Sequence, residues 1–156
     1  SSTSRGLGDV YKRQPLIYAL LFGMPGTPAL YYGSEWGISG EKAPCSDAGL
    51  RPALEKPEWN ALTSWIARLA AARRGSPALR EGSYRNVLLT NLQLIFERRT
   101  ETERVLVAVN ADSQPYTAHF DAGCGLAWDL ISGQQHDFGG GSQLPPYSAF
   151  FWKMER

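Results

Sequence analysis

The sequence predicts a chain of two unlike parts: an α/β segment over residues 15–76, followed by an all-β antiparallel sandwich over residues 77–156. The apolar residues repeat with the period of an α-helix before Pro77 and with the alternation of β-strands after it. Gly, Asn, Asp and Ser separate the later segments at short intervals, which is typical of antiparallel sandwiches.

The composition is that of a globular protein, with 156 residues of which 43% are apolar and 20% are charged. The 16 basic and 15 acidic residues give a formal charge of +1, so there is no reason to expect nucleic acid or a membrane as a partner. Cys45 and Cys124 lie outside any metal-binding spacing, and the sequence therefore predicts no metal site and no cofactor. It leaves the oligomeric state open.

Residues 1–14 are set apart from the fold prediction. Residues 9–14 resemble a translated sequencing adaptor, so we interpret this segment as an assembly artefact. The alternative is a natural polar tail, which we expect to be disordered. No apolar run reaches the length of a membrane span, since the longest, residues 16–24, stops at Pro25. The segment lacks the pattern of a secretory signal peptide, which leaves the compartment open.

Residues 15–32 have the pattern of a helix followed by a strand. Residues 15–22 are apolar on almost every side, as in a helix that is buried all round. Two prolines and two glycines in residues 23–28 then end the helix. The short apolar run 29–32 is typical of a strand buried on both faces of a parallel sheet. Together they make an αβ unit, which cannot be stable without neighbouring strands.

A long loop and a second helix complete the α/β segment. Residues 33–56 are polar, rich in glycine and proline and without periodicity, which predicts a loop at the carboxyl end of the strand, where parallel α/β barrels bind ligands. Pro57 begins the predicted helix. Its apolar stripe has i, i+3, i+4, i+7 spacing and consists of Leu62, Trp65, Ile66 and Leu69. Arg73 and Arg74 suit the dipole of its last turn, and Gly75 ends it.

The region after Pro77 contains six segments with the alternation and the β-branched and aromatic content of strands. They are residues 84–90, 92–98, 105–110, 116–120, 126–131 and 148–153. The aromatic residues Trp128, Phe150, Phe151 and Trp152 are interpreted as the core of the sandwich. A sugar-binding surface built on them is the alternative interpretation.

Residues 26–35 read Gly-Thr-Pro-Ala-Leu-Tyr-Tyr-Gly-Ser-Glu. This segment resembles the eighth-strand signature G-x-P-x-x-Y-x-G-x-E of glycoside hydrolase family 13, the α-amylase family. Every defining position is occupied, by Gly26, Pro28, Tyr31, Gly33 and Glu35. The resemblance implies that residues 15–76 are the end of a (β/α)₈ TIM barrel, comprising its last strand and helix, and that residues 77–156 are the C-terminal β-sandwich domain.

The resemblance also implies that the loop after this strand contacts substrate. Members of the family commonly place an Asp and an Arg four residues apart on this loop, where they hydrogen-bond sugar hydroxyls on the donor side of the cleaved bond. Asp47 and Arg51 have this spacing, and a surface ion pair is their alternative interpretation. Trp36 either stacks on a sugar ring or packs at the strand end. Glu35 is interpreted as structural, because the resemblance places the catalytic carboxylates upstream of Pro15.

The implied parent is therefore a retaining glycosidase that acts on α-1,4-glucosidic bonds of an α-glucan or maltooligosaccharide. We expect the present chain to contain no catalytic residue and to be inactive alone, while it supplies donor-side contacts and closes the barrel. A calcium site is an open possibility for the parent, and so is transglycosylase activity. Two alternatives remain: a non-catalytic member of the family, and a β-sandwich carbohydrate-binding module.

Overall fold

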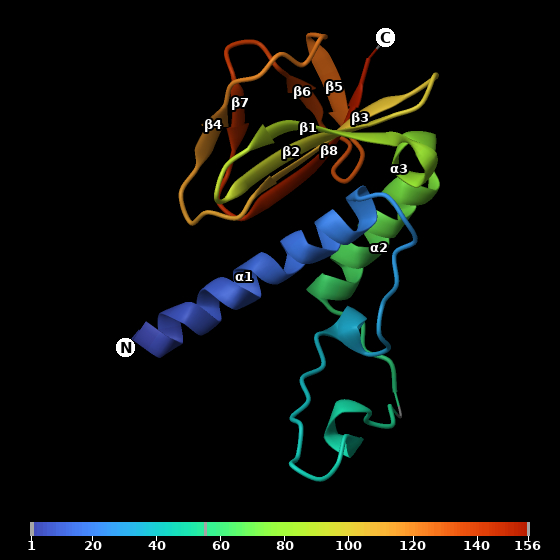
Figure 1. Cartoon of the computed structure of the whole chain (residues 1–156), viewed down its shortest axis with the longest axis vertical. Coiled ribbons are helices and arrows are strands. Elements are labelled where there is room, and N and C mark those ends of the chain that lie inside the picture. The colour runs from blue at the N-terminus through green and yellow to red at the C-terminus, as the bar shows by residue number, and fades with distance from the viewer. Residues whose placement is uncertain (1, 55, 156) are drawn as a thin grey trace.

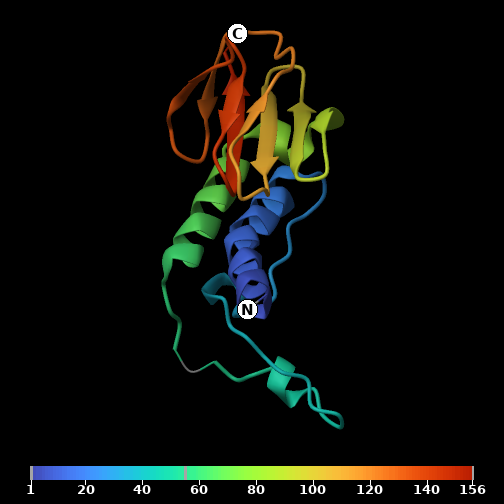
Figure 2. The same cartoon turned by 90° about the vertical axis from the view of Figure 1, so that its left-hand side faces the viewer.

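A computed structural model describes residues 2–54 and 56–155. Helices α1 (Ser2–Gly23) and α2 (Ala61–Arg74) pack against each other beneath a β domain, and a long connection between them extends away from the rest of the molecule (Figures 1 and 2). This connection contains two short 3₁₀ helices, η1 (Ser34–Trp36) and η2 (Ala48–Leu50). The short helix α3 (Pro77–Glu81) leads from α2 into the β domain.

Within the described residues, the strands form two antiparallel sheets. They are β1 (Ser83–Leu89), β2 (Gln93–Arg99), β3 (Arg104–Asn110), β4 (Tyr116–Ala118), β5 (Leu126–Asp129), β6 (Gln135–Asp137), β7 (Ser142–Leu144) and β8 (Ser148–Met154). The large sheet has the order β1-β2-β3-β8-β5-β6, and β4 pairs with β7 in the small one. The β2–β3 hairpin keeps one register from Gln93 opposite Asn110 to Arg99 opposite Arg104.

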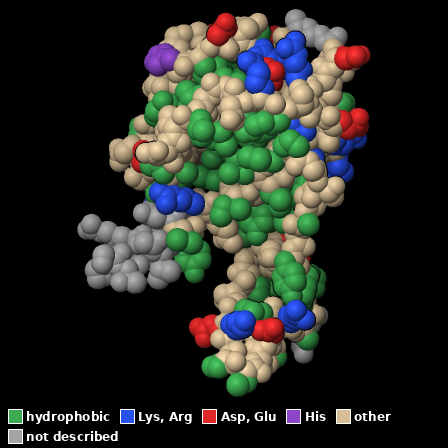
Figure 3. Space-filling view, viewed as in Figure 1, with side chains coloured by type: hydrophobic (Ala, Val, Ile, Leu, Met, Phe, Trp, Pro, Cys, Tyr) green, Lys and Arg blue, Asp and Glu red, His purple; other side chains and the backbone are tan. Residues whose placement is uncertain are grey.

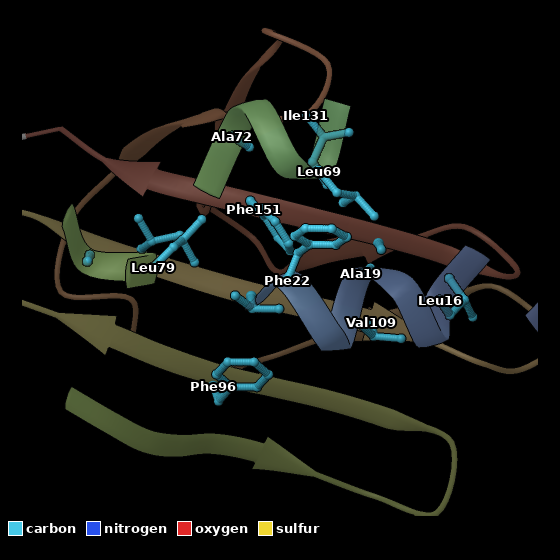
Figure 4. Close-up of a cluster of buried hydrophobic side chains, with 14 of the residues drawn as sticks. Leu16, Ala19, Phe22, Leu69, Ala72, Leu79, Phe96, Val109, Ile131 and Phe151 are labelled. Atoms are coloured by element: carbon cyan, nitrogen blue, oxygen red, sulfur yellow. The ribbon is translucent and has the colours of Figure 1, made fainter. Parts of the chain in front are cut away.

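The large sheet has an apolar core on each of its two faces, because side chains alternate along a strand. One face packs against the helices, as Figure 4 shows for Phe96, Val109 and Phe151 of the sheet with Phe22 of α1 and Leu69 of α2. The opposite face meets the small sheet. That second core contains Ile95, Leu106, Ala108, Ala118, Ala127, Leu144, Trp152 and Met154. The large sheet is thus the middle of three layers.

The predicted antiparallel β domain is confirmed, with small differences at the strand ends. Strands β6 and β7 and helix α3 were not predicted. Each of the two strands has three residues, which is too short for alternation to be visible. Ser76 caps helix α3, since its hydroxyl accepts from the Leu79 amide, and Pro77 occupies the first turn.

Helix α2 begins later than predicted, at Ala61 rather than Pro57. Asn60 caps it: the Asn60 side chain accepts from the Thr63 amide at 3.0 Å, and the Thr63 hydroxyl accepts from the Asn60 amide at 3.3 Å. This reciprocal pair satisfies two amides that the first turn leaves without helical partners. The predicted apolar stripe is confirmed, since Ile66 and Leu69 are buried.

Residues 2–14 are helical and continue α1, so the prediction of a disordered tail is wrong. The polar residues extend a helix whose nucleus lies in the buried segment after Pro15, which costs less than forming a new helix. Arg13 Nε donates to the Ala111 carbonyl at 3.0 Å and ties this extension to the β domain. Whether the segment is an artefact is a separate question, and that interpretation remains a prediction.

The predicted buried strand 29–32 is not formed. These residues have no strand assignment, and no strand of the described residues pairs with them. Tyr31 is 55% exposed, and its ring contacts that of Tyr32 at a centroid distance of 4.7 Å, whereas alternation along a strand would have separated the two. A parallel strand depends on hydrogen bonds to neighbours on both sides, and the described residues supply none.

Candidate substrate-binding loop

The glycines of the signature take backbone conformations that other residues rarely adopt. Gly26 has φ +101° and Gly33 has φ +85°, both in the left-handed region. A Cβ atom on Gly33 would lie 2.8 Å from Cδ1 of Ile38, which closes against it. The turn at Gly33 therefore requires glycine for both conformation and space, and this turn starts the loop that carries the predicted site.

The base of the loop is anchored to both long helices. The Thr63 hydroxyl in α2 donates to the Glu35 carbonyl at 2.7 Å, and the Asn60 side-chain amide donates to the Trp36 carbonyl at 2.9 Å. From α1, the Tyr18 hydroxyl donates to the Ser34 carbonyl at 3.3 Å. These bonds fix η1, so the loop starts from a defined position.

The two arms of the loop approach closely above this base. Cβ atoms built on Gly40 and Gly49 would lie 2.5 Å from the Gly49 carbonyl and 2.4 Å from the Glu41 carbonyl, which leaves room for glycine alone. A small cavity of about 80 Å³ lies between the arms and the tyrosine pair. Its lining includes Tyr31, Tyr32, Ile38, Leu50 and Pro52.

The three predicted site residues lie on two separate parts of the loop. Asp47 and Arg51 flank η2, while Trp36 is half-buried in η1, and none of the three lines the small cavity. Asp47 is exposed, and its carboxylate lies 3.9 Å from Lys42 Nζ. An ion pair between Asp47 and Arg51, the alternative interpretation, is not observed among the described residues, because the ion pair of Asp47 is with Lys42.

Arg51 lies near the tyrosine pair instead. Desolvation and the Tyr31 hydroxyl raise the pKa of Tyr32, and the charge of Arg51 opposes that shift. At neutral pH the phenol is therefore protonated, and it can donate as well as accept a hydrogen bond. This arrangement puts the Arg51 guanidinium near two phenols, while the Asp47 carboxylate lies near Lys42.

Two buried arginines, not predicted as part of the site, donate hydrogen bonds to the turn at residues 22–26, which precedes the loop. The Arg73 guanidinium donates to the carbonyls of Phe22 at 2.7 Å and Met24 at 2.9 Å, and also to Gly26. It thereby satisfies carbonyls at the end of α1, rather than acting on the dipole of its own helix as predicted. Burial lowers the pKa of Arg73.

Arg98 of β2 joins the same turn to the β domain. Its guanidinium donates to the carbonyls of Gly23 at 2.7 Å and of Leu79 and Gly82, both at 2.9 Å. Burial, and secondarily the charge of Arg73, lower its pKa. The partners of both arginines lie up to 75 positions away in the sequence, so no local pattern could have revealed these contacts.

The described residues contain no cluster of side chains that could bind a metal ion. Among residues 2–54 and 56–155, no three His, Cys, Asp or Glu side chains come together as metal ligands. Cys45 and Cys124 are free thiols. None of the helices in this part of the chain has the length and apolar character needed to cross a membrane.

Comparison with known proteins finds relatives among cyclomaltodextrin glucanotransferases and α-amylases. No family model matches the chain. It is 31% identical over 134 residues to a cyclomaltodextrin glucanotransferase of Bacillus sp. (strain 38-2), a match that covers 83% of this chain and 17% of the relative. It is 32% identical over 127 residues to the α-amylase MalA of Haloarcula japonica, covering 73% and 17%. The chain thus spans 17% of the length of these curated relatives.

Solved structures agree with these matches. An α-amylase from Anoxybacillus superposes with a TM-score of 0.81 at 23% identity, over 92% of this chain and 32% of that one, which shows the shared fold. The γ-cyclomaltodextrin glucanotransferase of alkalophilic Bacillus clarkii has a TM-score of 0.74 at 25% identity, over 92% and 23%. The chain thus has the fold of one part of these glucan-acting enzymes. It belongs to glycoside hydrolase family 13, the α-amylase family, as the signature at residues 26–35 indicated.

Proposed function

We propose that the chain is the C-terminal part of a retaining glycoside hydrolase acting on α-1,4-glucosidic bonds of an α-glucan or maltooligosaccharide. In this proposal residues 15–76 complete the catalytic barrel and residues 77–156 stabilise it. The observation that carries the proposal is the state of the signature segment, which has the residues of a buried strand but leaves Leu30, Tyr31 and Tyr32 exposed. A segment of this composition gains most from pairing within a sheet.

The loop would supply polar contacts to the donor side of the substrate. The carboxylate of Asp47 accepts hydrogen bonds and the guanidinium of Arg51 donates them, which suits neighbouring hydroxyls of a sugar. Both flank the turn η2, and both are exposed. The Trp36 carbonyl accepts a hydrogen bond from Asn60, and the residue is half-buried, so in this proposal its ring stacks on a sugar.

The catalytic pair would come from outside this chain. Retaining hydrolysis needs a carboxylate nucleophile and a carboxylic acid about 5–5.5 Å apart across the glycosidic bond. In the proposal Glu35 is structural, since its carbonyl accepts the Thr63 hydroxyl at the loop base. We therefore expect the chain alone to release no reducing sugar from maltooligosaccharides.

A chimera tests the proposal. The recipient is the cyclomaltodextrin glucanotransferase of Bacillus sp. (strain 38-2). In the first chimera, residues 15–156 of the present chain replace the matching region of that enzyme. In the second chimera, only residues 77–156 of the present chain replace that same region. The first is expected to act on starch and the second to be inactive. An inactive first chimera that folds, or equal activity in both, would count against barrel completion. A free-standing carbohydrate-binding module predicts that residues 15–76 contribute nothing.

Substitutions within the active chimera then test the loop. Asp47→Ala and Arg51→Ala should each raise KM about tenfold, equivalent to ~1.4 kcal/mol of lost binding. Glu41→Gln is the matched control, because Glu41 is an exposed charge on the same loop outside the predicted pair. An unchanged KM in both variants would remove Asp47 and Arg51 from the substrate site.

A further inference from the structure

Trp128 departs from the core position predicted for the aromatic residues of the β domain. Phe151 and Trp152 are fully buried, but Trp128 is 45% exposed. On β5 it alternates with Ala127 and Asp129, which are both buried, so its indole lies on the open side of that strand. A large aromatic ring left exposed beside a hollow is an informative exception to burial.

A hollow of about 660 Å³ lies beside this indole, at the end of the large sheet. Its walls come from the β2–β3 turn, from residues 123–124 and from the end of β8 with the residue after it. The volume falls within the range of roughly 300–1,000 Å³ that small-molecule sites have. The β2–β3 turn and the end of β8, which line the hollow, lie at the opposite end of the molecule from the loop between α1 and α2 (Figures 1 and 2).

The charged side chains that line the hollow are balanced in sign. The six are Arg99, Arg104, Lys153, Glu101, Glu103 and Glu155. Three cations and three anions favour neither an anionic nor a cationic ligand by long-range attraction. They do offer many donors and acceptors, which suits a neutral ligand rich in hydroxyl groups. Figure 3 shows basic and acidic side chains close together at this end of the molecule.

Several of these groups are already fixed. Trp128 Nε1 donates to the Glu155 carboxylate at 2.6 Å, which sets the orientation of the indole plane. The Ser76 hydroxyl donates to Glu103 at 2.8 Å, and Arg104 donates to buried Glu97. Side chains held in place before a ligand arrives lose less entropy on binding. The exposed side chains of Arg99, Glu101 and Lys153 are free to adapt around them.

We propose that this hollow is a second glucan-binding site, in which a sugar ring stacks on Trp128 and its hydroxyls bond to the surrounding charged groups. The choice of an α-glucan as the ligand rests on the proposed function. An apolar indole face suits the C–H side of a pyranose, and the balanced charges suit its hydroxyls. Such a site would hold one part of a long glucan while another part occupies the loop, which raises the effective concentration of substrate there.

Isothermal titration of the whole 156-residue chain with maltohexaose tests the site. Trp128→Ala should weaken binding at least about tenfold, and Trp128→Phe should weaken it less because a ring remains. Leu89→Ala is the matched control: Leu89 is an exposed apolar residue of the same sheet, on β1, outside the hollow. The assigned indole N–H resonance of Trp128 should shift on titration, which a merely structural effect of the substitution would not produce.

The double variant Asp47→Ala/Arg51→Ala separates this site from the loop. Maltohexaose binding to the chain that survives the double variant but is lost in Trp128→Ala supports the second site. Binding that survives Trp128→Ala and is lost in the double variant overturns it, while the proposed function stands. Absence of any binding to the folded chain also overturns the second site, and the activity of the chimeras decides the proposed function independently.

Discussion

The β domain and the loop between α1 and α2 differ in how their side chains are packed. Every buried polar side-chain atom in the described part of the molecule has a hydrogen-bond partner, and most of these atoms belong to the β domain and its junction with the helices. The loop instead leaves Tyr31, Tyr32 and Trp59 exposed. Figure 3 shows hydrophobic side chains on the surface of this lower part of the molecule. The β domain forms a buried core on each face of its large sheet, whereas no residue of the loop from Pro25 to Asn60 belongs to either core.

The buried Asn110 illustrates how polar groups inside the β domain are hydrogen-bonded. Its side-chain amide donates to three carbonyls, those of Gln114, Leu144 and Pro145, at 3.0–3.1 Å. Its side-chain oxygen accepts from the Gln93 amide at 2.8 Å. One polar residue thus joins β2, the chain after β3 and the end of β7. Inside the protein these hydrogen bonds replace the ones that water would make to the same groups.

The largest expected effect comes from the arginine that joins the two regions. Arg98→Ala removes a fully buried guanidinium that donates to Gly23, Leu79 and Gly82 and leaves their carbonyls without a donor. We expect the free energy of unfolding to fall by about 3–5 kcal/mol, since each buried group left unsatisfied costs ~1–3 kcal/mol. Urea denaturation measures this loss.

Arg99→Ala is the matched control, because Arg99 is the exposed neighbour on the same strand. It should change the stability by less than about 0.5 kcal/mol. Equal effects of the two substitutions would show that the contact between the β domain and the turn at the end of α1 contributes little. In that case the two regions would be more independent than their shared hydrogen bonds indicate.

Limited proteolysis compares the local stability of the loop with that of the β domain. Trypsin should cut after Lys42, in the exposed part of the loop, at least about tenfold faster than after Arg99, where the β2–β3 turn begins, because local opening of the loop costs less. Lys42→Gln should remove the fast cut and leave the slow one. Preferential cleavage at Arg99 would reverse the comparison.

Elements that depend on local sequence patterns could be predicted, and those that depend on partners distant in sequence could not. The longer strands from Ser83 onward are set by alternation of neighbouring residues, and α2 is set by the spacing of its apolar residues, so these elements were predictable, whereas the three-residue strands β6 and β7 were not. The strand at 29–32 was predicted from its composition, but a strand exists through its partners, and the described residues contain none for it. The loop could be assigned from a ten-residue signature. The roles of Arg73 and Arg98 could not, since their partners are carbonyls distant in sequence.

The smallest expected effect is a pH dependence inside the β domain. The His136 ring stacks on Trp152 at a centroid distance of 4.2 Å, and its Nε2 lies 2.9 Å from the Ser142 hydroxyl. Burial lowers the pKa of His136 below its ordinary 6.5, although Asp137 and Asp129 act in the opposite direction. The folded state therefore resists protonation of this ring more than the unfolded state does.

The sign of the effect follows from that difference. Below pH 6.5 the unfolded chain binds a proton at His136 that the folded chain still excludes, so stability is present above pH 6.5 and is lost as the pH falls through the lowered pKa of the folded state. Urea denaturation at a series of pH values should show this loss in the native chain and less of it in His136→Gln. His119→Gln is the control, because His119 is exposed and should keep the native pH profile. A His136→Gln profile identical to the native one would show that burial beside Trp152 does not couple this histidine to folding.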